Sequence, residues 1–178
     1  MANFKDCNHF ATHNDYYTPY SAWEQINSYI PNGVIFECFL LNSNEQSKKH
    51  LQKLGHTVVG DRTIDFLESD LPDFDAIVSN IPFERIKSYK ERKTNLKYRC
   101  LEKLFILDKP FIILMNNLNM FQKWFKEIIS GKDIKFIFPT KKIEYDKYDN
   151  GVKCDKGKGC SFNSIYVTYK VLDKNIWL

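Results

Sequence analysis

The sequence has 178 residues and no hydrophobic run long enough to cross a membrane. Its longest apolar run, Phe111 to Met115, is far too short to span a bilayer. The first residues, MANFKDCNHF, have neither the apolar core of a secretory signal nor an Arg-rich amphipathic pattern. We therefore expect a cytoplasmic protein that is not secreted and has no membrane partner.

Cysteines are few and irregularly placed. There are five of them, an odd number, and none has the closely paired spacing of a zinc site. This pattern favours reduced thiols and no metal. The cysteines are Cys7, Cys38, Cys100, Cys154 and Cys160.

Composition makes a disordered chain improbable, because 43% of the residues are hydrophobic and 15% are aromatic. We find no internal repeat and no linker, so residues 1–178 are predicted to form a single domain. The net charge of +4 permits a polyanionic partner without requiring one. Composition leaves the oligomeric state open.

Short apolar runs alternate with amphipathic segments along the chain, which predicts an α/β fold with a mostly parallel central sheet flanked by helices. The last two strands have only a long polar segment between them, so they are expected to form an antiparallel hairpin near one edge. The expected strands are 34–36, 57–60, 75–79, 110–115, 135–138 and 164–171, and the expected helices are 20–29, 43–54, 96–107 and 118–129.

Polar side chains follow three of the predicted strands directly: Glu37, Asp61 and Asn80. Each of these residues is also common in ordinary turns. In open α/β sheets, however, ligands bind at the carboxyl ends of the strands, near the point where the strand order reverses. Three such residues in succession favour a ligand crevice at this edge.

The segment Asn80-Ile81-Pro82-Phe83 follows a strand and carries the clearest chemistry. The Asn80 side-chain oxygen and the Ile81 carbonyl can accept the two hydrogens of an aromatic amine. Such bonds stabilise the positive charge that develops when the amine attacks an electrophile. Pro82 stiffens the loop, and Phe83 offers a face on which an extruded base can stack.

This loop resembles that of class I S-adenosylmethionine-dependent adenine-N6 DNA methyltransferases, especially small enzymes of phage and large viruses. The family loop is Asp/Asn/Ser-Pro-Pro-Tyr/Phe, so Asn80, Pro82 and Phe83 match and Ile81 departs. Ribosomal-RNA adenine dimethylases resemble Asn-Ile/Leu-Pro-Tyr/Phe here, which keeps RNA open as a substrate. The resemblance implies a Rossmann-like methyltransferase fold, DNA as partner, base flipping, and the cytoplasm of a bacterium or a virus-infected host.

Further blocks occur in the order of that family and are implied to bind S-adenosylmethionine. A Tyr-Thr-Pro block resembles the one that closes over the methionine part of the cofactor in the DNA enzymes, and its presence favours DNA over RNA. An acidic residue is expected on the ribose, and an Asp-Phe block at the adenine ring. The implied cofactor residues are Tyr17, Thr18, Pro19, Glu37, Phe39, Asp61, Asp65 and Phe66.

The largest departure from the family is the absence of its Gly-x-Gly turn, which Leu40-Leu41-Asn42-Ser43-Asn44 replaces. Asn42 and Asn44 tolerate left-handed conformations better than most residues do, so the turn is interpreted as divergent but usable. A descendant that binds nucleic acid without turnover is the alternative. Methylation of a protein glutamine, which uses a similar loop, has no other support in the sequence.

Two basic segments, 84–100 and 141–160, are candidates for contact with nucleic acid. Charge runs usually form solvated surfaces, but the first segment directly follows the candidate catalytic loop. The second contains tyrosines and suits target recognition. The candidate phosphate contacts are Arg85, Lys87, Lys90, Arg92, Lys93, Lys141 and Lys142.

Overall fold

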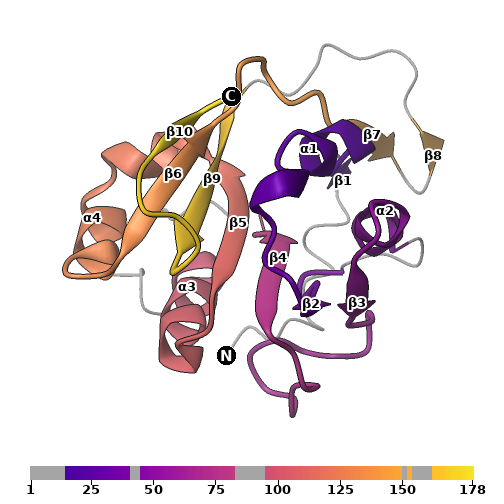
Figure 1. Ribbon diagram of the computed structural model, residues 1–178, viewed down its shortest axis with the longest axis horizontal. Coiled ribbons are helices and arrows are strands. Elements are labelled where there is room, and N and C mark those ends of the chain that lie inside the picture. Colours follow the sequence, from indigo (N-terminus) through magenta and orange to yellow (C-terminus); the bar gives the residue numbers. More distant parts are fainter. Residues whose placement is uncertain (1–14, 41–44, 83–94, 150–151, 154–161) are drawn as a thin grey trace.

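The computed structural model describes residues 15–40, 45–82, 95–149, 152–153 and 162–178 (Figure 1). Within these ranges the helices are too short and too polar to cross a bilayer.

A seven-stranded mixed sheet organises the chain, in the order β10-β6-β9-β5-β4-β2-β3. Four of its neighbouring pairs are parallel, and β9 is antiparallel to both β5 and β6. The predicted α/β fold is confirmed. The predicted antiparallel pair is β6 with β9, and it lies inside the sheet because β10 forms the outer edge beyond β6. The strands are β2 (Val34–Phe36), β3 (Thr57–Val59), β4 (Ala76–Asn80), β5 (Phe111–Asn116), β6 (Ile134–Phe138), β9 (Ser164–Tyr169) and β10 (Ile176–Trp177).

Helices cover both faces of this sheet, because its central strands are apolar on both sides (Figure 1). On β5, Phe111, Ile113 and Met115 pack in the cluster that includes α3 and α4. The intervening Ile112 and Leu114 pack in the cluster that includes α1 and α2. The helices are α1 (Tyr20–Glu24), α2 (Gln46–Lys53), α3 (Leu96–Leu107) and α4 (Lys123–Ile129).

Two predicted helices are shorter than expected. The segment 20–29 forms α1 followed by a separate 3-10 turn, η2 (Asn27–Tyr29). The predicted helix 118–129 is wrong as one continuous element, since a 3-10 helix, η4 (Asn117–Phe121), precedes α4. The break lies at Gln122, whose extended backbone (φ −82°, ψ 136°) ends one helix and starts the next.

A second, three-stranded sheet lies beside α1 and α2 (Figure 1). Its strands are β1 (Asp15–Tyr17), β7 (Asp146–Asp149) and β8 (Val152–Lys153), and β7 pairs antiparallel with both neighbours. This sheet could not be predicted from the sequence, because its strands are short and polar and lack an apolar alternation. It joins the N-terminal Tyr-Thr-Pro block to the long segment between β6 and β9.

Candidate active site

The strand order predicts a ligand site at the carboxyl ends of β2 and β4. From β2 the chain first adds β3 on one side and then returns to add β4 on the other, so the order reverses at β2. Ligands bind at such a switch point in open α/β sheets. Glu37 directly follows β2, and Asn80 is the last residue of β4. The structure thus brings together two of the residues selected from sequence.

Asn80 is held by the N-terminal block. Its side-chain nitrogen Nδ2 donates to Thr18 Oγ1 at 3.0 Å. The side-chain oxygen Oδ1 is buried and has no hydrogen-bond partner within the described part of the chain. A buried polar atom without a hydrogen-bond partner costs about 1–3 kcal/mol of stability. Such atoms are uncommon in folded proteins, and a bound ligand is one explanation for them. Asn80 Oδ1 is therefore the candidate acceptor for a ligand at the carboxyl end of β4.

Glu37 is a buried carboxylate, with 2% of its surface exposed. Its two oxygens accept hydrogen bonds from the hydroxyls of Ser47 and Ser79, and from the Phe39 amide at 3.2 Å. Burial, the largest influence, raises the pKa of Glu37 to about 7, against the lowering effect of these bonds. No cation pairs with Glu37 among the contacts within the described residues, so a bound cation would stabilise its charged form.

Two serines that donate to Glu37 were not predicted as site residues from the sequence. Ser47 lies on α2, accepts from Trp23 Nε1 at 3.0 Å and donates to Glu37. Ser79 is fully buried on β4, directly before Asn80. The sequence marks Ser79 only as a hydroxyl at an otherwise apolar strand position. Its role follows from the hydrogen bond that it donates to Glu37.

Gly60, after β3, allows the chain to pass close to Glu37. Its φ of +112° disfavours side chains, and a Cβ there would overlap the Glu37 carbonyl oxygen and lie 3.1 Å from the Phe36 ring. Gly55 has a similar φ of +97°, but no atom lies within 4 Å of where its Cβ would be. A side chain would strain the backbone at both positions, and only at Gly60 would it also collide with a neighbouring segment.

We expect Gly60→Ala to destabilise the protein by roughly 2 kcal/mol more than Gly55→Ala, since both strain the backbone by about 1 kcal/mol and only the first adds a collision. Urea unfolding of the two variants and the wild type measures the difference. Equal losses would show that the close approach at Glu37 contributes nothing.

Asp61, the acidic residue expected on a ribose, is exposed. Its Oδ1 accepts from the Thr63 amide at 2.7 Å and from the Thr63 hydroxyl. The Thr63 hydroxyl and amide lower the pKa of Asp61. A charged, exposed carboxylate at the end of β3 suits the hydrogen bonds of a ribose diol.

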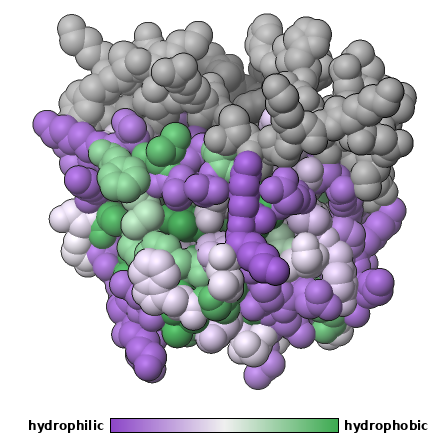
Figure 2. Space-filling model, turned by 90° about the horizontal axis from the view of Figure 1, so that it is seen from above, coloured by the Kyte–Doolittle hydropathy of each residue, from purple (hydrophilic) through white to green (hydrophobic). Residues whose placement is uncertain are grey.

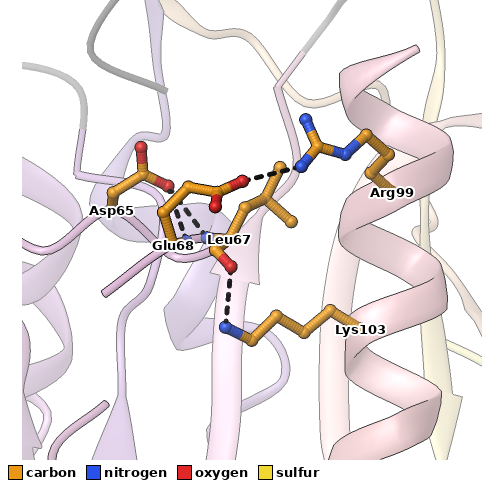
Figure 3. Close-up of polar contacts among 5 residues, drawn as sticks. All are labelled: Asp65, Leu67, Glu68, Arg99 and Lys103. Carbon is orange, nitrogen blue, oxygen red and sulfur yellow. Dashed lines mark hydrogen bonds and ion pairs between the residues drawn. The ribbon is translucent and has the colours of Figure 1, made fainter. Parts of the chain in front are cut away.

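Asp65 begins a turn that is fastened to α3 (Figure 3). Its Oδ1 accepts from the amides of Leu67 at 2.9 Å and Glu68 at 3.3 Å. Glu68 then pairs with Arg99 at 2.8 Å, and Lys103 donates to the Leu67 carbonyl at 3.2 Å. Asp65 therefore has a local structural role, to which a contact with the adenine amine would be additional.

The aromatic rings assigned to the cofactor lie in the core. Phe66 has no exposed surface, and its ring centroid lies 5.1 Å from that of Phe39, which is 7% exposed. The Phe66 ring has no open face for a ligand, so a contribution from Phe66 would come through its backbone. Tyr17 and Pro19 flank the buried Thr18 and are half-buried.

The candidate catalytic loop continues from Asn80 into the core. The Ile81 amide donates to the Leu114 carbonyl at 3.1 Å, and its side chain is fully buried beside α3. Pro82 is also buried.

Several predicted site residues lie outside the described residues. They are Phe83, the basic residues Arg85, Lys87, Lys90, Arg92 and Lys93, and Asn42 and Asn44 of the glycine-free turn. In that region, Glu45 (φ 47°) has the left-handed conformation before α2.

Lys141 and Lys142 are exposed and follow the carboxyl end of β6. Strands β4, β5 and β6 run in the same direction, so these lysines lie at the same edge of the sheet as Asn80. Figure 2 looks onto this edge, where polar side chains adjoin a smaller group of apolar ones.

The arrangement of strands is similar to that of a solved structure from Listeria monocytogenes. That protein is provisionally assigned as a class I S-adenosylmethionine-dependent methyltransferase. The match has a TM-score of 0.51 at 12% identity, and covers 90% of this chain and 64% of that protein. No protein-family model matches the chain, and no curated protein does.

The likeness shows the class I methyltransferase fold. The chain is thus a Rossmann-like α/β protein, and its candidate site, with Glu37 and Asn80, lies at the switch point of the sheet.

Proposed function

We propose that the chain is an S-adenosylmethionine-dependent methyltransferase that modifies the exocyclic amine, N6, of adenine in DNA. The observation that carries the proposal is the buried Oδ1 of Asn80 at the carboxyl end of β4, which has no hydrogen-bond partner among the described residues. Adenine N6 has two hydrogens and a lone pair that is delocalised into the ring. An acceptor for one of these hydrogens is what the amine needs in order to become a better nucleophile.

The described residues fit the proposed cofactor. S-adenosylmethionine supplies a methyl group on a positively charged sulfonium, and its amino group is a second cation. Glu37 provides a buried carboxylate without a cation of its own among the described contacts, and Asp61 provides an exposed carboxylate one strand away. These residues would hold the cationic portion and the ribose respectively.

Asn80 and the loop after it perform the protein's share of the reaction. The Asn80 oxygen accepts one amine hydrogen, and the Ile81 carbonyl is proposed to accept the other. As the new N–C bond forms, the electrons of the S–C bond remain on sulfur and the amine releases one proton to solvent. The two oxygens stabilise the positive charge that builds on the nitrogen before that proton leaves.

DNA is favoured over RNA for two reasons. The Tyr17-Thr18-Pro19 block resembles the DNA enzymes, and its Thr18 contacts Asn80 directly. The RNA reading depended on Ile81, but the side chain at this position is fully buried. Packing alone accounts for an apolar residue there, so Ile81 no longer favours RNA.

Lys141 and Lys142 supply a test of the nucleic-acid surface. Log affinity falls as log salt concentration rises, and each lysine that contacts a phosphate adds roughly one to the steepness of this fall. We therefore expect the double variant Lys141→Ala, Lys142→Ala to reduce the magnitude of the slope for duplex DNA by about two, as measured by fluorescence anisotropy.

The control for this pair removes Lys132 and Lys174, which are exposed and precede β6 and β10 at the opposite edge of the sheet. The control should leave the slope unchanged. If both double variants lower the slope equally, binding depends on overall charge and not on this edge.

The activity itself is tested in two stages. Calorimetry measures S-adenosylmethionine binding, and labelled methyl transfer to DNA and to RNA is followed by digestion to nucleosides. We expect N6-methyladenine in DNA. Methylation of RNA alone would establish the second reading, binding without transfer would establish an inactive descendant, and no binding at millimolar cofactor would overturn the proposal.

A further inference from the structure

Thr18 contacts the amide of Asn80 and is itself deeply buried, with 4% of its surface exposed. Its hydroxyl oxygen accepts from Asn80 Nδ2 at 3.0 Å, while Asn80 Oδ1 has no partner in the described part of the chain. The resemblance to known enzymes implied a role for Thr18 at the cofactor. Its observed contact is with the residue proposed to act on the substrate.

The contact determines which atom of the amide meets the substrate. The terminal torsion of asparagine is broad and roughly two-fold, so an unrestrained amide can present either its oxygen or its NH₂ group. Only the oxygen accepts an amine hydrogen, and the NH₂ group would oppose it with its own hydrogens. A hydroxyl that accepts from Nδ2 fixes the amide in one orientation, with its NH₂ group at Thr18 and its oxygen on the other side.

The small sheet holds Thr18 in place. Strand β1 ends at Tyr17, directly before Thr18, and pairs with β7 from Asp15↔Tyr148 to Tyr17↔Asp146. Asp146 in turn accepts from Gln46 Nε2 of α2 at 2.7 Å. The position of Thr18 thus depends on residues far away in the sequence.

Aromatic side chains also pack where β1 pairs with β7. The ring of Tyr16 lies edge-on to those of Tyr145, at 6.1 Å, and Phe162, at 5.7 Å. Tyr145 precedes β7 and Phe162 precedes β9, so Tyr16 of β1 contacts residues from two separate parts of the chain.

We propose that Thr18 is a positioning residue for the amide of Asn80, held there by the pairing of β1 with β7. The inference rests on the proposed methyl transfer, because it assigns a role within that reaction. It predicts that the Thr18 hydroxyl affects the rate of methyl transfer through Asn80 and has no effect on the affinity for the cofactor.

The test compares Thr18→Val, which keeps the branched shape and loses the hydroxyl, with Thr18→Ser, which keeps the hydroxyl. Without the hydroxyl the amide of Asn80 can turn its NH₂ group toward the substrate, so we expect kcat of Thr18→Val to fall about tenfold or more. Thr18→Ser should restore most of the rate. Calorimetry should give the same cofactor Kd for all three proteins.

Thr168→Val provides the matched control for the loss of a buried hydroxyl. Thr168 lies on β9, is fully buried and donates to the Lys135 carbonyl at 3.1 Å. It is expected to lower stability to a similar extent and to leave kcat unchanged. Combining Thr18→Val with Asn80→Ala should cost no more rate than Asn80→Ala alone, because the two residues act through one amide.

The failures are distinguishable. If the wild type transfers no methyl group, the proposed function fails before Thr18 is tested. If the wild type is active and Thr18→Val retains full kcat, Thr18 does not position Asn80. A weaker cofactor Kd with unchanged kcat, or losses that add fully to those of Asn80→Ala, would also overturn the inference and return Thr18 to the cofactor.

Discussion

Asn80→Ala should lower the rate of methyl transfer by about 10²–10³-fold, the loss typical when one preorganised hydrogen-bonding group that stabilises transition-state charge is removed. The buried Oδ1 of Asn80 is the proposed acceptor for an amine hydrogen, and alanine leaves that hydrogen without a partner. Single-turnover transfer of labelled methyl to DNA measures the chemical step. Cofactor affinity should change by less than about twofold, because the proposed cofactor carboxylates are untouched.

Asn80→Asp is the matched control for this prediction. A carboxylate accepts the amine hydrogen as well as an amide oxygen does, and the Thr18 hydroxyl can donate to the other oxygen. The resembling family also has Asp at this position. We therefore expect Asn80→Asp to keep most of the activity. An Asn80→Ala variant with wild-type rate would rule out the proposed role of Asn80.

The central strands and their mostly parallel arrangement could be predicted in outline from the sequence. Runs such as Phe111–Met115 are apolar throughout, which is typical of strands covered on both faces. The helix at 96–107 was predicted at its observed bounds, and its start is marked by Asn95, whose side chain accepts from the amide of Lys97 at 3.1 Å. These signals are local, so a single sequence contains them.

The residues that the site needs from elsewhere could not be predicted. Ser47 and Ser79 are ordinary serines until the fold brings both to Glu37. Likewise, Thr18 suited a cofactor role until its hydroxyl was seen at Asn80. Each of these contacts joins residues from separate elements, and pattern and propensity contain no information on such pairs. At Phe66 the family resemblance implied a cofactor contact, and the sequence did not show that the ring would be fully buried in the core.

Stability should fall by about 3 kcal/mol between pH 4.5 and pH 7 because of Glu37 alone. The pKa of Glu37 is raised from 4.5 to about 7, chiefly by burial. Below pH 4.5 the group is protonated in both the folded and the unfolded chain, and its full contribution to stability is present. As the pH rises through this window, the unfolded chain loses the proton first, so the contribution is lost progressively and is gone above pH 7.

Glu37→Gln tests this dependence, because the amide has nearly the same shape and does not titrate. Urea unfolding at several pH values should show the variant with a flatter profile than the wild type over the window from 4.5 to 7, and relatively more stable at pH 8. Glu102→Gln, at an exposed position of α3, is the control for the loss of one carboxylate at the surface. If Glu37→Gln keeps the wild-type slope, Glu37 is ionised throughout in the folded protein. Its burial would then be compensated in full by Ser47, Ser79 and the Phe39 amide, and a cofactor cation would gain little from it.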